Sequence, residues 1–225
     1  MTTSLHEVIQ LAAQHRVVPV IQELFSGAES PVAIFEKVAG TTPGSFLLES
    51  AEHGVWSRYS FIGVNSRGTL SKDSAGQVSW NSSDGHSAFP SDVTRPLPES
   101  ALDALQLLCA SWTSKPIDGL PPLTSGLVGT LAWDIIREIE DLPSAPPSAY
   151  NSPMMVFAMM QDVIVVDHQT SKLLLVSNIF VDDHTRLEAD YENAVARIAA
   201  MRTSFTEPSE PFLATLSGQA ESLEA

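Results

Sequence analysis

Cysteine is almost absent from this chain of 225 residues, whose one thiol is Cys109. A lone cysteine cannot form a disulfide within the chain, and a zinc site built on thiolates needs several. Cys109 lies among leucines at helical spacing, a pattern that predicts a buried structural thiol rather than a nucleophile. The sequence therefore excludes an internally disulfide-stabilised fold and favours a reducing compartment, the cytoplasm.

Basic residues are also scarce, since 12 Lys and Arg face 27 Asp and Glu for a formal charge of −15. Binding to nucleic acid or to an anionic membrane surface needs a Lys/Arg face that this composition does not supply. The longest apolar runs, 154–160 and 173–181, fall well short of the roughly 18 residues of a spanning helix. Residues 1–14 lack the pattern of a signal peptide. We expect a soluble protein with no nucleic-acid and no membrane partner.

Motifs for phosphate or metal binding are missing as well. The six histidines are scattered, and His168 and His184 fit a turn and a helix start better than a metal site. Gly126 and Gly129 lie in a strand-like segment, where glycines indicate close packing or a bulge. The residues thus give no metal or cofactor site.

Carboxylates in one segment leave two interpretations open. Asp134, Glu138 and Glu140 could perform acid–base catalysis in a self-sufficient enzyme. However, Asp134, Glu138 and Asp141 follow roughly helical steps, which favours a solvated helix face. No nucleophile, base and orienting group occur together in the sequence.

Hydrophobic residues make up 44% of the chain, enough for a sizeable core. Helices are predicted at 5–14, 30–40, 100–112 and 183–202; Ser30 and Pro31 supply the N-cap and first position of the second. Strands are predicted at 16–24, 45–50, 58–65, 68–73, 77–81, 125–133, 154–167 and 172–180. Pro19 suits an edge strand. Hairpins mixed with separated helices predict an α+β fold with largely antiparallel sheets and a few packed helices.

Three segments carry a family resemblance. They are Phe-Leu-Leu-Glu-Ser at 46–50, Trp-Ser-Arg-Tyr-Ser-Phe-Ile-Gly at 56–63, and a glycine-rich stretch at 121–134 that closes with Glu-Asp-Leu-Pro at 140–143. Together they resemble the amino-terminal domain of anthranilate synthase component I, in the right order over most of 15–203. Thr130 departs from the pattern, since an aromatic residue is common there.

The resemblance implies a domain of the chorismate-utilising enzyme type over 1–203. Residues 204–225 contain no Lys or Arg and four glutamates, and we expect a flexible acidic tail or linker towards a missing catalytic domain. In the family, that carboxy-terminal domain binds chorismate and Mg²⁺ and forms anthranilate and pyruvate in tryptophan biosynthesis. We therefore expect no catalytic residue, metal or cofactor on this chain, which alone should be inactive.

The resemblance also implies a tryptophan feedback site. By motif position, Ser50 is the foremost contact, with Glu49, Leu48 and Pro31 close to it. Strand alternation places Leu48 and Ser50 on one face and Glu49 on the other, so that Leu48 walls an apolar slot and Ser50 offers a hydroxyl. The alternative is that Ser50 ends a strand and Glu49 is a surface charge.

The partners implied are L-tryptophan, the glutamine amidotransferase subunit (component II) and the chain's own carboxy-terminal chorismate-binding domain. Two further interpretations remain. One is the equivalent domain of aminodeoxychorismate synthase component I in the folate pathway, and the other is a module that only docks the amidotransferase.

Overall fold

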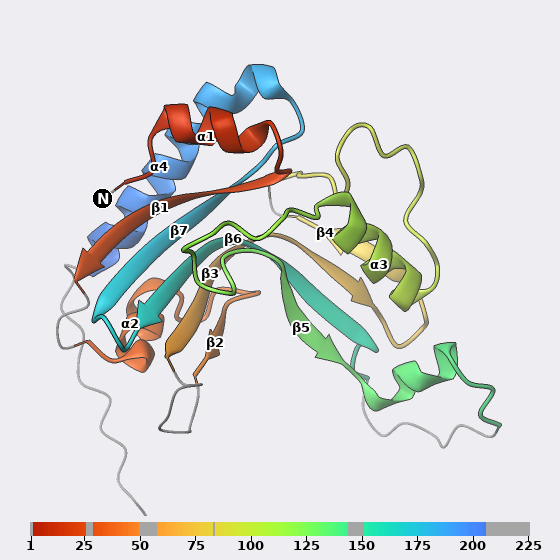
Figure 1. The fold of residues 1–225 in the computed structure, drawn as a ribbon. Coiled ribbons are helices and arrows are strands. Elements are labelled where there is room, and N and C mark those ends of the chain that lie inside the picture. The colour runs from red at the N-terminus through yellow and green to blue at the C-terminus, as the bar shows by residue number, and fades with distance from the viewer. Residues whose placement is uncertain (1, 26–28, 50–57, 83, 144–150, 206–225) are drawn as a thin grey trace, which may run out of the picture.

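The computed structural model describes residues 2–25, 29–49, 58–82, 84–143 and 151–205. In these ranges one seven-stranded antiparallel sheet is surrounded by four α-helices and two short 3-10 helices (Figure 1). The helices are α1 (Leu5–Ala12), α2 (Pro31–Val38), α3 (Ala101–Ser111) and α4 (Leu187–Ser204), with the 3-10 helices η1 (Trp133–Glu138) and η2 (His184–Arg186). The strands are β1 (Val17–Phe25), β2 (Phe46–Leu48), β3 (Tyr59–Lys72), β4 (Val78–Asn81), β5 (Leu127–Leu131), β6 (Met155–Asp167) and β7 (Lys172–Phe180). The predicted α+β class is confirmed.

The sheet order is β1-β7-β6-β3-β2, with β4 paired to β3 and β5 paired to β6. Strand β1 lies at an edge, as Pro19 predicts, because proline has no N–H to donate to a further strand. The hairpin of β3 and β4 is confirmed, with its turn closed by Gly76 at φ +87°. Serine N-caps open three helices, at Ser4, Ser30 and Ser100.

One prediction of strand boundaries is wrong. The segments 58–65 and 68–73 form the single strand β3, which pairs with β6 along nearly its whole length. Register shifts between Gly63 and Gly68 interrupt the ladder of hydrogen bonds between β3 and β6. These β-bulges also interrupt the alternation of apolar side chains, so the sequence resembles two strands separated by a gap. The bulges divide the sheet into two halves, one with β1, β7 and β2 and one with β4 and β5.

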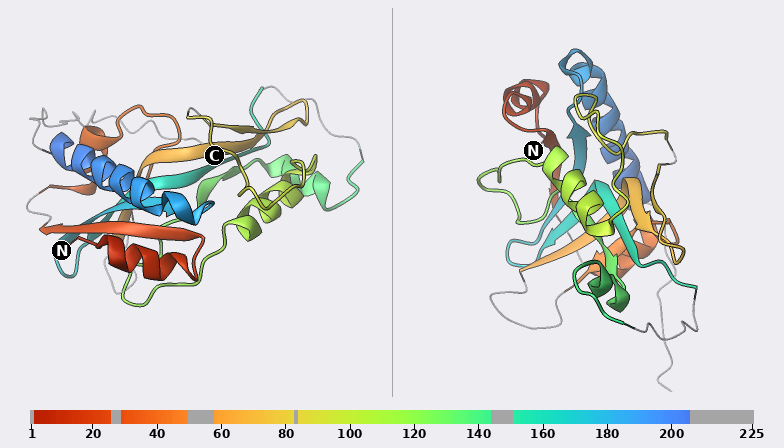
Figure 2. Two further views of the ribbon diagram at one scale, coloured as in Figure 1. Left: turned by 90° about the horizontal axis from the view of Figure 1, so that it is seen from above. Right: turned by 90° about the vertical axis from the view of Figure 1, so that its right-hand side faces the viewer.

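The first half is covered on one face by α1, α2 and α4. We call this the helix-covered face; its core includes Ile34 from α2 and Ile198 from α4, packed with Ile62 and Leu175 from the strands. Figure 2 shows α4 lying along the sheet, with α1 beside the β1 edge. Its buried cluster consists of aliphatic side chains and Met201, against which Phe35, Tyr191 and Phe205 pack.

The opposite face of the same half is covered mainly by the extended segment 113–126, and we call it the loop-covered face. Its core includes Val163, Val165 and Val176, and Leu120 and Leu123 from the covering segment pack on it. Alternate residues of β6 and β7 serve the two faces, so these strands read as continuous apolar runs.

The second half packs against α3. Glu138 from η1 is the chief polar link: its carboxylate accepts hydrogen bonds from the backbone N–H groups of Ala101 and Leu102 and from the hydroxyl of Ser100, at 3.0–3.3 Å. Lys72 Nζ lies 2.6 Å from Glu138 Oε1. Although burial acts to raise the pKa of Glu138, these bonds hold it below its usual value.

Two predictions in this half are wrong. Glu138 lies on no solvated face, because its side chain is only 13% exposed and binds the amino terminus of α3. Cys109 is exposed, because the buried stripe of α3 runs through Ala104 and Leu108 instead.

Candidate ligand-binding site

The short strand β2 borders the loop-covered face at the end of the sheet opposite η1. It pairs with β3 so that Phe46 lies opposite Gly63 and Leu48 opposite Phe61. The ring of Phe46 covers Gly63 so closely that a Cβ there would lie 2.1 Å from Phe46 Cε1. Glycine is therefore required at 63 for β2 to approach, and this contact fixes the register that positions Leu48.

The residues predicted from the Leu-Leu-Glu-Ser motif divide between the two faces. Leu47 packs against the helix-covered core, whereas Phe46 packs on the loop-covered face, so alternation places Leu48 there too. Leu48 is 43% exposed, and Glu49 is exposed at the end of the strand. Pro31 is buried at the start of α2, on the helix-covered side, and is not brought onto the face of Leu48. Ser50 lies outside the described residues.

Aromatic rings of β3 continue the surface that Leu48 begins. The centroids of Tyr59 and Phe61 are 6.0 Å apart with an interplanar angle of 41°. The guanidinium carbon of Arg58 lies 4.7 Å from the centroid of the Tyr59 ring. These half-buried rings form an apolar wall with a cation at its end.

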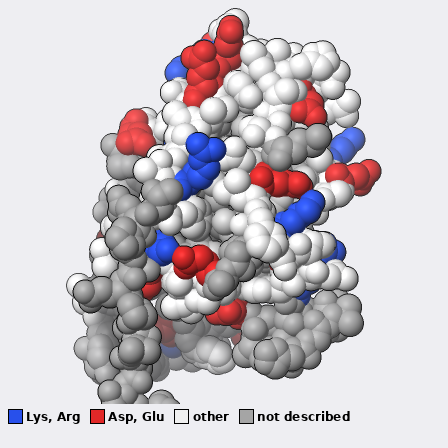
Figure 3. All heavy atoms as spheres, turned by 90° about the vertical axis from the view of Figure 1, so that its left-hand side faces the viewer, with Lys and Arg blue, Asp and Glu red and all other residues white. Residues whose placement is uncertain are grey.

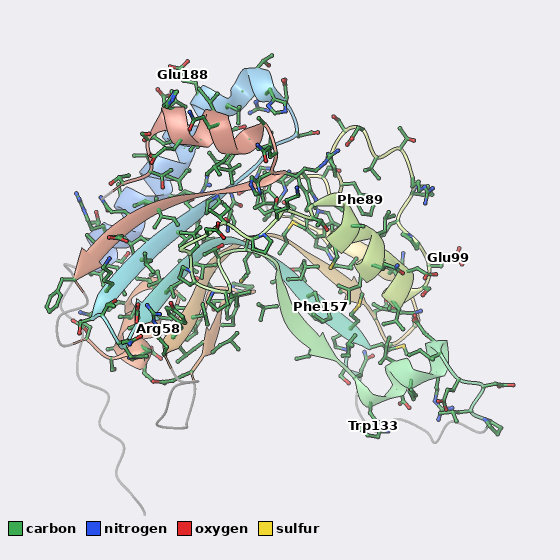
Figure 4. The ribbon with its side chains drawn as sticks, in the orientation of Figure 1. Arg58, Phe89, Glu99, Trp133, Phe157 and Glu188 are labelled. Atoms are coloured by element: carbon green, nitrogen blue, oxygen red, sulfur yellow. The ribbon has the colours of Figure 1, made fainter. Side chains whose placement is uncertain are left out.

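Arg58 is fixed by a bidentate ion pair with Asp167, at 3.0 Å from Nε and 2.7 Å from Nη2 (Figure 4 labels Arg58). The Asp167 carboxylate also accepts bonds from the hydroxyl and N–H of Thr170 and from the N–H of Gln169. The bond from Arg58 is the largest influence on the pKa of Asp167 and lowers it. Burial acts to raise this pKa, but the Arg58 bond and the bonds from Thr170 and Gln169 together hold it well below its ordinary range. The pair therefore stays ionised at neutral pH and holds the guanidinium beside Tyr59.

A cavity of about 260 Å³ opens next to this wall. Its apolar lining comes from Ile21, Tyr59 and Leu174, and its charged lining includes Arg58 and Lys172. The remaining lining residues are Thr2, Thr3, Glu7, Glu23, Gly119, Leu120, Pro121, Asp167 and Thr170. In Figure 3, which shows the left-hand side of Figure 1, the basic and acidic side chains of the described residues are interspersed. Such a lining suits a small ligand with an apolar ring and charged groups of both signs.

The site shows features of binding rather than of catalysis. The nearest serine–histidine pair, Ser60 Oγ and His168 Nε2 at 2.8 Å, is unsuited to nucleophilic attack because Ser60 is 1% exposed. His168 occupies an exposed turn, as predicted. Within the described ranges, no group of three or more metal-ligating side chains occurs, and no helix is long and apolar enough to span a membrane.

Sequence reasoning missed the polar half of this site. Arg58 lies within a motif that the sequence singled out, but its partner Asp167 is 109 residues away. No periodicity links residues so far apart, because only strand pairing of β3 with β6 brings Tyr59 opposite Asp167. The turn motif at 167–171 was the one local signal that Asp167 is held in place.

Comparison with known proteins places this geometry in context. The chain is 36% identical over 220 residues to anthranilate synthase component 1 of Mycolicibacterium smegmatis, an alignment that covers 96% of this chain and 40% of the relative. It is 35% identical to the protein of the same name from Arthrobacter globiformis, covering 92% and 38%. The chain thus spans about two fifths of the length of these relatives. No protein-family profile matches the sequence.

The fold has a counterpart among solved structures. The crystal structure of anthranilate synthase component I from Streptococcus pneumoniae superposes with a TM-score of 0.52 at 16% identity, over 83% of this chain and 37% of that one. At this identity the likeness concerns the fold alone, and it agrees with the antiparallel sheet described above.

Proposed function

The chain belongs to the anthranilate synthase component I family, where it corresponds to an amino-terminal portion, and on this premise we propose that it forms the regulatory part of the enzyme. In this proposal the described portion binds L-tryptophan as feedback inhibitor and docks the glutamine amidotransferase subunit. Conversion of chorismate and ammonia to anthranilate and pyruvate, with Mg²⁺, is assigned to residues outside this chain.

The observation that carries the tryptophan site is an exposed apolar side chain next to an aromatic wall and a fixed cation. Leu48 and Phe61 offer a surface for the indole, because large apolar rings gain most from leaving water. Arg58, held by Asp167 beside the Tyr59 ring, lines the adjoining cavity as a donor for a carboxylate. Lys172 and Glu23 line the cavity farther from Leu48, on β7 and β1, and pair with each other at 3.2 Å. An amino acid with an aromatic side chain matches the apolar wall and the cation at its end.

The cavity also suits a site that is completed by another part of the polypeptide. Its volume of about 260 Å³ is slightly below the roughly 300–1,000 Å³ of most small-molecule sites. We infer that the carboxy-terminal portion present in the relatives supplies the missing wall, so that the chain alone binds tryptophan weakly. In the whole enzyme, tryptophan and chorismate would then oppose each other's binding by the same factor.

Protein docking is supported by the arm formed by β5 and η1 at the other end of the sheet. Four apolar side chains of this region, Leu131, Trp133, Ile139 and Leu142, are 41–93% exposed, and Trp133 is the most exposed of them. Figure 4 shows Trp133 where β5 meets η1, far from Arg58. Exposed apolar groups gathered in one region are typical of protein contacts.

The other interpretations are less well supported. The two relatives described above are anthranilate synthases by name, which disfavours the aminodeoxychorismate branch. A self-sufficient enzyme built on Asp134, Glu138 and Glu140 is disfavoured because Glu138 is bonded to α3 and Lys72. If the chain were a module that only docks the amidotransferase, the exposed Leu48 and the aromatic wall beside it would have no role.

The test is calorimetric titration of L-tryptophan into the chain, alone and with the separately produced carboxy-terminal portion of the M. smegmatis relative. Leu48→Ser should weaken binding about tenfold, because it removes apolar contact area from the slot. Val32→Ser is a matched control, since Val32 is 44% exposed and belongs to α2 on the other face.

Ser50→Ala, measured alongside, tests the motif residue itself. Leu48→Ser and Val32→Ser should change the free energy of unfolding by similar amounts, because the two residues are 43% and 44% exposed. Absence of saturable tryptophan binding with both portions present, or equal weakening by both serine variants, would refute the proposed site.

A further inference from the structure

A second cavity, of about 630 Å³, lies on the side of the sheet that faces α4. It is enclosed by the bulged part of β3, the end of β7, the helix α4 and the loop around His86. Its lining is mostly polar and consists of Asn65, Ser66, Arg67, Asp84, His86, Gln161, Asp162, Asn178, Ile179, Phe180, Arg186, Asp190, Asn193, Ala196, Arg197 and Ala200. None of these residues lines the cavity beside Arg58.

Arg67 is the unusual group in this cavity. Its guanidinium carbon lies 4.7 Å from the centroid of Phe180 and 5.2 Å from that of Trp112, and these two rings meet edge to face at 5.2 Å. The guanidinium is thus packed against two aromatic rings, which offer its N–H groups no carbonyl or carboxylate acceptor. The buried Nε atom of Arg67 has no hydrogen-bond partner.

The nearby carboxylates do not supply that partner. No described carboxylate forms an ion pair with Arg67. Asp162 is fully buried and accepts from Arg197, Ser177 and Asn65. Asp182 accepts from the N–H and hydroxyl of Ser91, at 2.7 and 2.8 Å.

Burial lowers the pKa of Arg67, although the more distant charges of Asp182 and Asp190 act to raise it. His86, in the same lining, has its pKa lowered first by burial and then by the charge of Arg67. His86 is therefore neutral at pH 7, while the guanidinium remains charged. The cavity holds a partly desolvated cation whose charge no direct contact balances, and a buried charge is normally paired.

We propose that this cavity binds the oxyanion group, carboxylate or phosphate, of a small soluble molecule, with Arg67 as the anchoring cation. The two rings restrict the guanidinium, and its planar set of N–H donors suits bidentate contact with two oxygens of one group. The Asp162–Arg197 pair holds α4 against the sheet and thereby keeps the cavity open. This site is separate from the proposed tryptophan site, and each can fail without the other.

The experiment uses ¹⁵N-labelled chain and follows the Nε–Hε signal of Arg67 during titration at constant ionic strength. Potassium phosphate and sodium succinate are titrated separately, and calorimetry gives the affinity of each. Arg67→Lys identifies the signal by its loss, keeps the charge, and should weaken binding about tenfold because the bidentate fork is gone. Arg16→Lys is the matched control, since Arg16 forms an exposed bidentate pair with Asp92.

A saturable shift of the Arg67 signal, with binding weakened in Arg67→Lys and unchanged in Arg16→Lys, is the expected result. Whichever of phosphate and succinate binds more tightly identifies the chemical group. The proposal is overturned if neither anion shifts the signal at concentrations up to about 10 mM, or if Arg67→Lys binds as well as the unmodified chain. Arg67 then serves only to cover the two rings. The signal of the unmodified chain decides the question even if Arg67→Lys does not fold.

Discussion

The two faces of the half-sheet that contains β1, β7 and β2 are made by alternate residues of the same strands, yet they are covered in different ways. Ile62 and Leu175 lie on the face under three helices, whereas Phe61 and Leu174 lie on the face under an extended segment, where Leu174 lines a cavity. The buried clusters of both faces contain only aliphatic and methionine side chains, with aromatic rings packed at their margins. At the margin of the loop-covered face, the rings of Tyr59 and Phe61 lie beside the ion pair of Arg58 with Asp167.

This difference shows how the cover, rather than the strands, determines what lies over the apolar core of each face. Helices bring rows of apolar side chains and satisfy their own backbone groups, so they seal the aliphatic core beneath them, and the polar cavity around Arg67 lies beyond that core at the bulged part of β3. An extended segment seals less area and leaves rings half-buried, where a ligand can complete the burial. We therefore expect substitutions on the helix-covered face to affect stability most and those on the loop-covered face to affect binding most.

The largest contrast is expected between neighbours on β3. Ile62→Ala should lower the free energy of unfolding by about 3–4 kcal/mol, because Ile62 is fully buried and its removal leaves a cavity. Phe61→Ala should cost only about 1–2 kcal/mol, because its ring is half-buried. Urea denaturation of both variants measures the two values. An equal or larger loss for Phe61→Ala would contradict the distinction between the faces.

An intermediate effect is expected at the contact that fixes β2. Gly63→Ala should cost about 2–3 kcal/mol, because the added Cβ would overlap the ring of Phe46. The double variant with Phe46→Ala should recover about 1–2 kcal/mol of the loss, since the overlap is then removed. Chemical denaturation of the two single variants and the double variant gives the coupling, and additive losses would show that the ring does not cause the cost.

The smallest effect is expected at the charged margin. Asp167→Asn should cost about 1–2 kcal/mol at pH 7 through the bonds that the carboxylate accepts. Because the folded-state pKa of Asp167 is lowered, its stabilisation is present at neutral pH and is lost as pH falls from about 4 through that lower value. The variant should therefore lose less stability than the unmodified chain between pH 5 and pH 2 (roughly the range in which aspartates titrate).

Asp92→Asn serves as the control for that measurement, since Asp92 pairs with Arg16 at an exposed position. It should change stability less than Asp167→Asn at pH 7, because exposed pairs are screened by solvent. Parallel acid unfolding curves for the unmodified chain and Asp167→Asn would show that this carboxylate contributes nothing to acid sensitivity.

Local patterns in the sequence predict most of the elements. Ser30 and Pro31 open α2 as expected, and Pro19 identifies β1 as an edge strand, because capping and proline geometry act within a few residues. The bulged strand β3 was divided in the prediction because a bulge changes the alternation of side chains without ending the strand. Glu138 was misjudged because its partners on α3 precede it by more than 30 residues.

For the candidate site, the sequence predicts the face of Leu48 but not what surrounds it. Alternation along β2 predicts that Leu47 and Leu48 lie on opposite faces of the sheet. In the structure Leu47 packs on the helix-covered face, and Phe46, which shares a face with Leu48, packs on the loop-covered face. The pairing of Arg58 with Asp167 depends on the register of β3 against β6, which a single sequence does not encode in any local pattern. The assignments of Ser50 and Glu49 to tryptophan remain predictions.

The pairing of β1 with β7 has a consequence for how the chain is made. The register joins Val17 to Phe180 and Phe25 to Lys172, so β1 cannot pair with β7 until residues 172–180 have been translated. At about 5–20 residues per second, a ribosome leaves β1 waiting on the order of ten seconds. During that interval its apolar residues are accessible to chaperones, and β1 should join the sheet only after β7 has been made.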